Sequence, residues 1–354
     1  MDGFQTKTPA RAGLDYPVGD VPAPGETLEI LPGLHWVRMP LPFSLKWINL
    51  WLIDDGEAGW TIVDTGMPLD DTKKAWRKIF EEKLDGRPVW RIIVTHMHPD
   101  HVGNAGWLSR KFPGAELWMS QLEYITCRML VADTGREAPQ AGIDFYRAAG
   151  WNEDQIKTYC GRFGGFGRGV SQMPDAYRRL VDGETIRLGG HDWQVIVGRG
   201  HSPEHACLFN AEQNVMISGD QLLPRISSNV SVHPTEPLAN PLKDWLDSCR
   251  KLRGHLPEDA LILPAHNEPF RGAHKRLDDL IRGHEVGLRR LKQRLGQAPR
   301  RVIDVFPSIF GRAIGDDVLS MATGEAIAHL RCLIGRGEAT VSRDGDGVDW
   351  YTAA

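Results

Sequence analysis

The stretch "THMHPDH" gathers four good metal ligands, His96, His98, Asp100 and His101, directly behind the apolar run "VWRIIV". The apolar run predicts a buried strand that ends at these residues. On an extended backbone, side chains two residues apart point to the same side, so His96 and His98 can face one ion. Asp100 and His101 follow the turn set by the intervening proline and can face a second position. Imidazole is a common ligand of zinc-type metals. So short a segment therefore favours two neighbouring metals over one.

Two metals require further ligands, and the sequence offers them at the ends of later apolar runs. His201 follows "WQVIVGRG", Asp220 ends "NVMISGD", and His266 ends "ALILPAH". Each stands where a predicted strand gives way to a loop. Alternating strands and helices in this region indicate a layered α/β domain. We expect these ligands to meet at one edge of it.

The motif "HMHPDH", followed in order by His201, Asp220 and His266, resembles the metallo-β-lactamase superfamily, and "VDTG" at 63–66 matches a further signature of that family. The resemblance covers roughly residues 28–270. It implies an αββα sandwich. It also implies a ligand set in which one metal takes His96, His98 and His201, the second takes Asp100, His101 and His266, and Asp220 bridges the two.

That resemblance further implies two Zn²⁺ ions per chain, with iron or manganese as alternatives. Two such ions lower the pKa of a shared water and polarise a carbonyl group. Asp100 would then take or relay a proton. Asp64, within "VDTG", either orients a ligand histidine through its other ring nitrogen or simply caps a turn.

Four residues near the ligands are candidates for supporting or substrate-lining roles. His205 lies close to His201 in sequence, and either supports the site or is an ordinary histidine. The segment after Asp220 must leave the metal edge, so it can line the pocket or form a structured loop. The candidates in this segment are Arg225, Ser228 and Asn229.

The remaining sequence divides into an arm, an insertion and a tail. Residues 1–27 are rich in Pro and Gly and predict an irregular arm, before the main domain at 28–270. Within that domain, helical periodicity over roughly 121–174 predicts an inserted lobe, and its "GRFGGFGRG" segment suggests a lid. Residues 271–354 predict a one-sided helix, then a helix and a hairpin, similar to a winged-helix-like domain. In the main domain, we also expect a helix that begins near residue 70 and is capped by Asp70 or Asp71.

Composition narrows the classes of partner. The chain has 354 residues, a formal net charge of -4 and 25% charged residues, which gives no reason to expect nucleic acid or an anionic membrane. No apolar run approaches the ~20 residues of a membrane span. Five scattered cysteines and the lack of a visible export signal favour the cytoplasm. The C-terminal region at 271–354 could serve for dimerisation, so a homodimer is one expected partner arrangement.

The ligand set is most similar to glyoxalase II-type thioesterases and lactonases. This chain has "GHSPEH" where glyoxalase II usually reads "GHTPGH", and no glutathione-binding residues can be matched. We therefore predict a metal-dependent hydrolase of a small-molecule thioester or ester, such as an acyl-CoA. The alternatives are an endoribonuclease of the winged-helix-bearing branch, a lactonase or weak β-lactamase, and a non-catalytic metal-binding or interaction role. The acidic hairpin tip "RDGDGVD" disfavours a nucleic-acid substrate.

Overall fold

The computed structural model describes residues 13–354, so the first part of the predicted N-terminal arm lies outside the described residues. The described part of the arm runs beside the end of the main domain. Asp15 and Arg271 exchange two backbone hydrogen bonds, of 3.2 and 2.8 Å.

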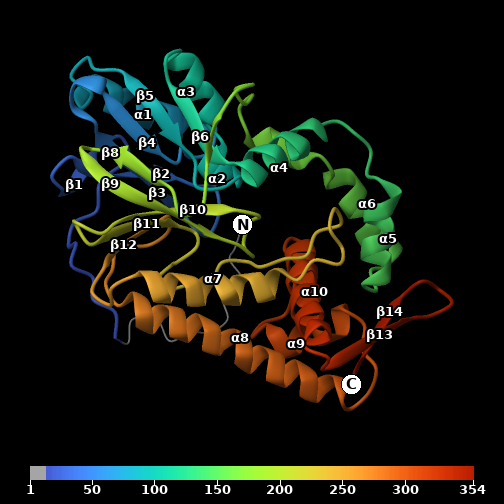
Figure 1. Cartoon of the computed structure of the whole chain (residues 1–354). Helices are drawn as coiled ribbons and strands as arrows, with labels where there is room; N and C mark the ends of the chain where they lie inside the picture. The colour runs from blue at the N-terminus through green and yellow to red at the C-terminus, as the bar shows by residue number, and fades with distance from the viewer. Residues whose placement is uncertain (1–12) are drawn as a thin grey trace.

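Two sheets form the centre of the molecule (Figure 1). The first has seven strands in the order β1 to β7, and the second has five in the order β12-β11-β10-β9-β8. The first sheet consists of β1 Thr27–Leu31, β2 Leu34–Pro40, β3 Trp47–Asp54, β4 Trp60–Val63, β5 Val89–Ile93, β6 Glu116–Ser120 and β7 Arg178–Leu180. The second consists of β8 Thr185–Leu188, β9 His191–Gly198, β10 His205–Asn210, β11 Val215–Gly219 and β12 Leu261–Pro264.

The sheets bury one face against each other and the other face against helices. Trp36, Trp51 and Trp193 belong to the apolar cluster shared by the two sheets. Strands such as β3, with six consecutive buried residues, are apolar on both faces because both faces are covered. The parallel pairs β4–β5 and β5–β6 need crossover connections, which α1 Asp70–Glu82 and α3 Ala105–Lys111 supply. The expected αββα sandwich is confirmed.

The expected cap of the first helix is wrong. Leu69 occupies the N-cap position of α1 and makes no side-chain capping bond. Asp70 and Asp71 instead lie in the first turn. Their negative charges interact favourably with the positive end of the helix dipole. The two aspartates therefore mark the start of the helix, although neither is its N-cap.

A helical insertion joins β6 to β7. It contains α4 Gln121–Ala132, α5 Gln140–Ala148, α6 Glu153–Arg162 and the short 3-10 helix η2 Gly165–Gly169. Residues 165–169 of the glycine-rich segment form this 3-10 helix. It lies against the ligand-bearing loop, since a Cβ on Gly169 would come within 3.0 Å of the Pro99 side chain. Ser171 N–H also donates to Gly103 O at 2.7 Å. Its role as a lid stays a prediction.

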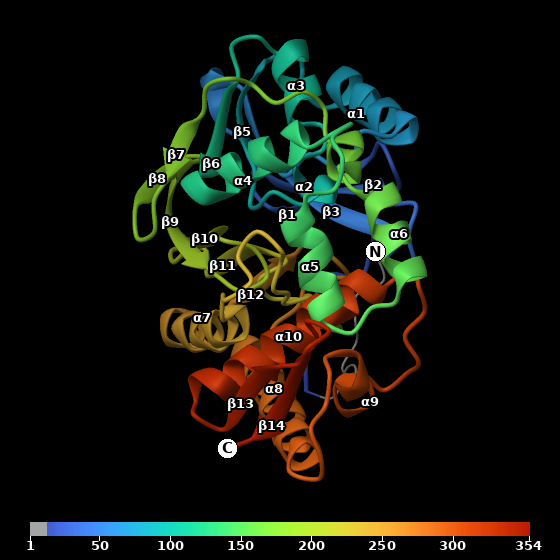
Figure 2. The same ribbon diagram turned by 90° about the vertical axis from the view of Figure 1, so that its right-hand side faces the viewer.

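The C-terminal region packs on the outer helix of the second sheet (Figure 2). It follows α7 Pro241–His255, and consists of α8 Ala273–Leu295, η3 Ile303–Val305, α9 Phe306–Ile309, α10 Leu319–Gly335 and the hairpin β13 Ala339–Arg343 and β14 Asp349–Ala353. Leu288 of α8 and Leu330 and Leu333 of α10 share one buried cluster. The insertion reaches this region, because Trp151 Nε1 donates to Thr323 Oγ1 at 2.9 Å. The winged-helix comparison stays a prediction.

Across residues 13–354, none of the helices combines the length and apolar character that a membrane crossing requires.

Candidate metal centre

Seven ligand candidates come together at the edge where strands of both sheets end. His96 and His98 follow β5, and the short helix α2 Pro99–Val102 carries Asp100 and His101. The three downstream residues follow β9, β11 and β12. The two sheets are joined at this edge by a 2.8 Å hydrogen bond from Ala206 N–H to Thr95 O. The side chains form two groups, one of His96, His98, His201 and Asp220, and the other of Asp100, His101 and His266.

The first group is tightly convergent. His98 Nδ1 lies 2.9 Å from His96 Nε2 and 3.1 Å from His201 Nε2. Asp220 Oδ2 lies 3.3 Å from His201 Nε2 and 4.0 Å from His96 Nε2. Four potential ligand atoms therefore surround one point.

The second group shares Asp220 with the first. His266 Nε2 lies 3.4 Å from Asp100 Oδ2 and 3.4 Å from Asp220 Oδ1. His101 Nε2 lies 3.6 Å from the same Asp220 oxygen. Asp220 thus directs one carboxylate oxygen to each group, which is the arrangement that a bridging ligand requires.

Hydrogen bonds on the far side of the rings fix which nitrogen faces the site. His201 Nδ1 donates to Asn229 O at 2.7 Å, and His266 Nδ1 donates to Trp47 O at 3.0 Å. Carbonyl oxygens only accept, so these ring nitrogens carry the protons and each Nε2 turns a lone pair inward. Each imidazole is held in the form that binds a cation.

The donor set fits divalent cations. Ring nitrogens about 3 Å apart repel each other when both direct a lone pair inward, unless a proton or a metal ion lies between them. In tetrahedral zinc sites, bonds of about 2.0–2.1 Å place neighbouring ligands about 3.3–3.4 Å apart. Within the described residues, the buried atoms His101 Nε2 and Asp220 Oδ1 have no hydrogen-bond partner. Both point into the second group, so a metal would satisfy them.

The two groups of ligands differ in their electrostatic environment. Burial, with the neighbouring histidines, lowers the pKa of His96 well below its usual value and that of His98 to about 3, so both rings are neutral. Burial also opposes the charged form of His101, but Asp64, Asp100 and Asp220 outweigh it and raise its pKa well above the usual value. The second group therefore lies in a concentration of negative charge that favours a cation.

Asp64 has the geometry of the expected orienting residue. His101 Nδ1–H donates to Asp64 Oδ2 at 2.7 Å, and Thr95 N–H donates to the other carboxylate oxygen at 2.8 Å. Asp64 adopts a left-handed backbone with φ of 61°, which aspartate tolerates better than most residues. This turn directs the carboxylate inward behind the ligand ring.

The other predicted supporting residues divide into two kinds. His205 Nε2 accepts from Asp220 N–H at 3.0 Å, and Ser228 Oγ donates to Asp220 O, so both hold the backbone of the shared ligand. Asn229 supplies the carbonyl that orients His201. Arg225 differs, because its guanidinium pairs with Glu268 at 2.6 Å.

Sequence reasoning missed Glu123, a fully buried carboxylate on α4. It accepts from Met97 N–H at 2.9 Å, from Ser202 Oγ–H at 2.6 Å and from Glu204 N–H at 2.7 Å. It therefore ties the loop of His96 and His98 to the loop of His201. Burial raises the pKa of Glu123, although these hydrogen bonds oppose the rise. The sequence feature that could have identified Glu123 is an acidic residue on the otherwise apolar face of a predicted helix.

Glu325 of α10 was missed as well. Its carboxyl accepts from Asn229 Nδ2 at 2.8 Å, and the backbone of Asn229 accepts from His201. Burial raises the pKa of Glu325 to about 8, so it carries a proton at neutral pH. The C-terminal region thereby reaches a ligand histidine through one intermediate residue.

Comparison with known proteins agrees with this geometry. The family model described as "Metallo-beta-lactamase superfamily" matches residues 48–266, and the model "Metallo-beta-lactamase-like, C-terminal domain" matches 288–354. A β-lactamase domain protein from Burkholderia ambifaria is 39% identical, with a TM-score of 0.87 and coverage of 96% of this chain and 97% of that one. A metallo-β-lactamase family protein from Thermus thermophilus is 26% identical, with a TM-score of 0.76 and coverage of 92% and 100%.

Curated relatives carry thioesterase names. An atrochrysone carboxyl ACP thioesterase from Aspergillus fumigatus is 24% identical over 67% of this chain, and the chain spans only 41% of that protein. An acyl-coenzyme A thioesterase, MBLAC2, from Gallus gallus is 24% identical over 67% of this chain and 79% of its own length. A second atrochrysone carboxyl ACP thioesterase, from Emericella nidulans, is 23% identical over 86% and 80%.

Proposed function

The chain belongs to the metallo-β-lactamase superfamily, and from that premise we propose that this hydrolase cleaves a small-molecule acyl thioester with two zinc ions held by the seven clustered residues. The observation that carries the proposal is Asp220, whose two oxygens face the two ligand groups separately. Relatives named as an atrochrysone carboxyl ACP thioesterase and as an acyl-coenzyme A thioesterase support the substrate class.

The residues of this chain have distinct tasks in such a reaction. Two divalent ions bound here would supply an activated water and would polarise the thioester carbonyl. Burial opposes the ionisation of Asp100, but the charge of His101 and the hydrogen bond of His266 outweigh it and lower the pKa of Asp100 to about 2. Asp100 is therefore ionised at neutral pH and can accept the proton of the attacking water. It would then pass that proton to the departing thiolate.

Zinc is the proposed metal because the first group is dominated by imidazole nitrogens, which favour zinc-type ions, and its ligand atoms lie within 4.8 Å of one another. The ligand assignment keeps the expected pairing, with His96, His98 and His201 on one ion, Asp100, His101 and His266 on the other, and Asp220 between them. Metal analysis of the purified protein tests this directly. Two equivalents of zinc are expected, and a stable content of one metal or of iron contradicts the assignment.

The test of function is hydrolysis by zinc-reconstituted protein, with Asp220→Ala as the inactive control. The panel contains acyl-CoA and glutathione thioesters, lactones, a β-lactam and single-stranded RNA. We expect turnover of acyl thioesters that is lost in the control. Turnover of RNA or lactones with silent thioesters would refute the proposed substrate while leaving the metal site intact.

A further inference from the structure

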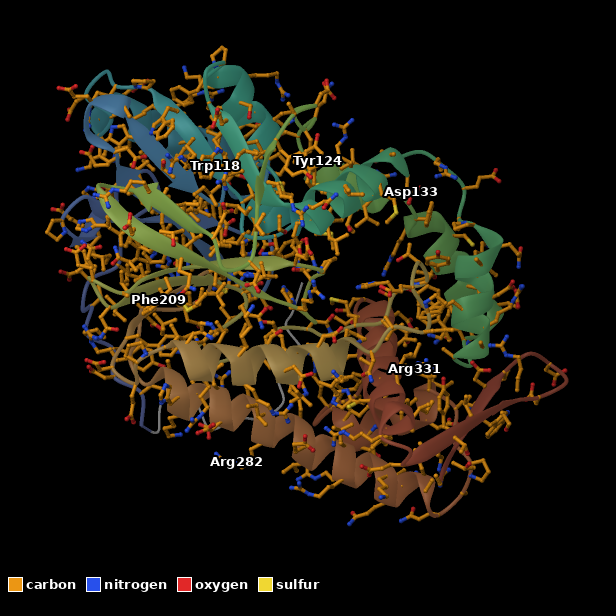
Figure 3. The ribbon with its side chains drawn as sticks, viewed as in Figure 1. Trp118, Tyr124, Asp133, Phe209, Arg282 and Arg331 are labelled. Atoms are coloured by element: carbon orange, nitrogen blue, oxygen red, sulfur yellow. The ribbon has the colours of Figure 1, made fainter. Side chains whose placement is uncertain are left out.

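Helix α8 carries a buried arginine that holds one short loop. Arg276 is 2% exposed, although arginine is almost never fully buried unless it is paired. Within the described part of the chain, its side chain hydrogen-bonds to two backbone carbonyls and to no carboxylate. Its Nε–H donates to Leu223 O at 2.6 Å, and its Nη2–H donates to Ile226 O at 2.7 Å. Figure 3 labels Arg282 farther along the same helix, which packs on α7.

The loop that Arg276 holds starts at the shared ligand candidate. Residues 221–228 leave Asp220 and return to it, because Ser228 Oγ–H donates to Asp220 O. Leu223 and Ile226 are buried, so water cannot readily replace the guanidinium at their carbonyls. Without Arg276, the middle of the loop would contain two buried acceptors that lack a donor, and the loop would have to change shape to satisfy them.

The chain that continues from this loop reaches a second ligand. Asn229 O accepts from His201 Nδ1–H at 2.7 Å. Three residues later, Val232 N–H donates to Gly324 O of α10 at 3.0 Å, which fixes the far end of the segment. One segment, held in its first half by Arg276 and at its end by α10, therefore lies behind two of the ligands.

A displacement of Asp220 has a different consequence from a displacement of His201. Asp220 Oδ2 lies 3.3 Å from His201 Nε2 in the first ligand group, and Asp220 Oδ1 lies 3.4 Å from His266 Nε2 in the second. A shift in the backbone of Asp220 therefore disturbs both groups. A shift of His201 alone disturbs only the first, so metal binding can distinguish the two cases.

We propose that Arg276 is a positioning residue for Asp220, because its guanidinium fixes the shape of loop 221–228 and so keeps the two carboxylate oxygens directed at the two ligand groups. The inference rests on the two-metal site of the proposed function. Arg276 acts through the loop and contacts no ligand side chain. Partners outside a metal site commonly contribute about 10–100-fold to metal affinity, and here the contribution extends to both metals.

The test measures the two zinc dissociation constants of the Arg276→Met variant by competition with a chromophoric chelator. Methionine keeps an unbranched apolar side chain in the core but removes both donors. We expect both constants to rise roughly tenfold or more. The matched control is Arg91→Met. Arg91 is also buried, at 4% exposed, and its Nη1–H donates to a backbone carbonyl, that of Arg187, at 2.7 Å. The control should lose stability and keep both zinc constants.

Three results would overturn the positioning role. In the first, folded Arg276→Met binds both zinc ions as the wild type does. In the second, only one constant rises, since the loop would then act through His201 alone. In the third, Arg91→Met shows the same rise, which would make the effect a general result of lost stability. If circular dichroism shows that Arg276→Met does not fold, Arg276→Lys replaces it. One ammonium group cannot reproduce the two fixed donors of the guanidinium, so both constants should rise by a smaller factor, and unchanged constants contradict the proposal.

Zinc binding separates this inference from the proposed function because it requires no turnover. If the wild type binds two zinc ions but cleaves no thioester, the proposed substrate fails, and the constants of Arg276→Met still decide the role of Arg276. If the wild type binds a single zinc ion, the two-zinc assignment fails. An unchanged constant for that ion in Arg276→Met then excludes the positioning role, and a rise of roughly tenfold supports it.

Discussion

At the scale of single residues, three of the ligand histidines are constrained by a partner outside the site. Asp64 holds His101, and a backbone carbonyl holds each of His201 and His266. Such partners fix the ring orientation and raise the affinity of the ligand for metal. The buried carboxylate of Asp64 also accepts from Thr95, so it connects the ligand-bearing loop to the turn after β4.

Replacing Asp64 with Asn should weaken metal binding by roughly 10–100-fold. The amide cannot offer two acceptor oxygens to His101 and Thr95 at once. Zinc retained against a competing chelator measures the effect. Asp304→Asn, which alters a carboxylate paired with Arg301 in the C-terminal region, should leave the affinity unchanged. Equal zinc retention in both variants would contradict the role of Asp64.

At the scale of elements, two helices outside the sandwich stabilise the ligand loops. Helix α4 does so through Glu123, and α10 does so through Glu325 and Asn229. Neither helix carries a ligand. The loops at the sheet edge therefore depend on the insertion and on the C-terminal region for their shape.

Replacing Glu123 with Gln should lower both stability and metal affinity. An amide has one acceptor oxygen, so at least one of the donors Met97 N–H, Ser202 Oγ–H and Glu204 N–H loses its bond. A buried unsatisfied donor costs about 1–3 kcal/mol. Urea unfolding and zinc competition measure the two effects. The exposed Glu153→Gln change on α6 is the control, and matching values for the two variants would exclude this role.

Glu325 predicts a pH dependence of stability. Burial raises its pKa to about 8 in the folded protein, above the ordinary value of 4.5. The folded state then binds more protons than the unfolded state between these values, so the contribution of Glu325 to the free energy of unfolding falls as pH rises through that window. The Glu325→Gln variant should lose this part of the slope. Urea unfolding across that pH window is the measurement, and identical slopes would contradict the buried neutral state.

At the scale of the whole molecule, the insertion and the C-terminal region meet beside the site. Trp151, just after α5, donates to Thr323 on α10, and Ile303 N–H donates to Ala149 O. Figure 1 shows α5 and α6 reaching from the sandwich toward α10. The insertion and the C-terminal region are thus joined by hydrogen bonds at Ala149 and Trp151.

A double-mutant cycle of Trp151→Phe and Thr323→Val should give a coupling energy of about 0.5–1.5 kcal/mol, the usual net value of one hydrogen bond. Each single change leaves a buried polar group without its partner, whereas the double change removes both. Thermal and urea unfolding measure the four proteins. Additive effects would show that the two segments are not energetically linked.

Residue types and their spacing were enough to predict the ligand candidates and a layered α/β domain, whereas the αββα sandwich was implied by the resemblance to the metallo-β-lactamase superfamily. His96, His98 and the later ligands stand at the ends of short apolar runs, whose length favours buried strands over helices. Strand ends converge at one edge of a layered domain, so the local pattern was enough to bring these residues together. The orienting role of Asp64 was one of two readings that the sequence left open.

Long-range contacts in the folded chain determine which residues hold those ligands. Glu123 and Glu325 lie far along the chain from the groups they support, and neither belongs to a local motif. Their partners are backbone N–H groups, a hydroxyl and an amide, which any sequence can supply. The prediction of the N-cap of α1 failed for a similar reason. The observed N-cap Leu69 lies one position before Asp70, and tertiary packing decides at which of these residues the helix begins. Periodicity identifies an element, but long-range packing determines what each of its faces contacts.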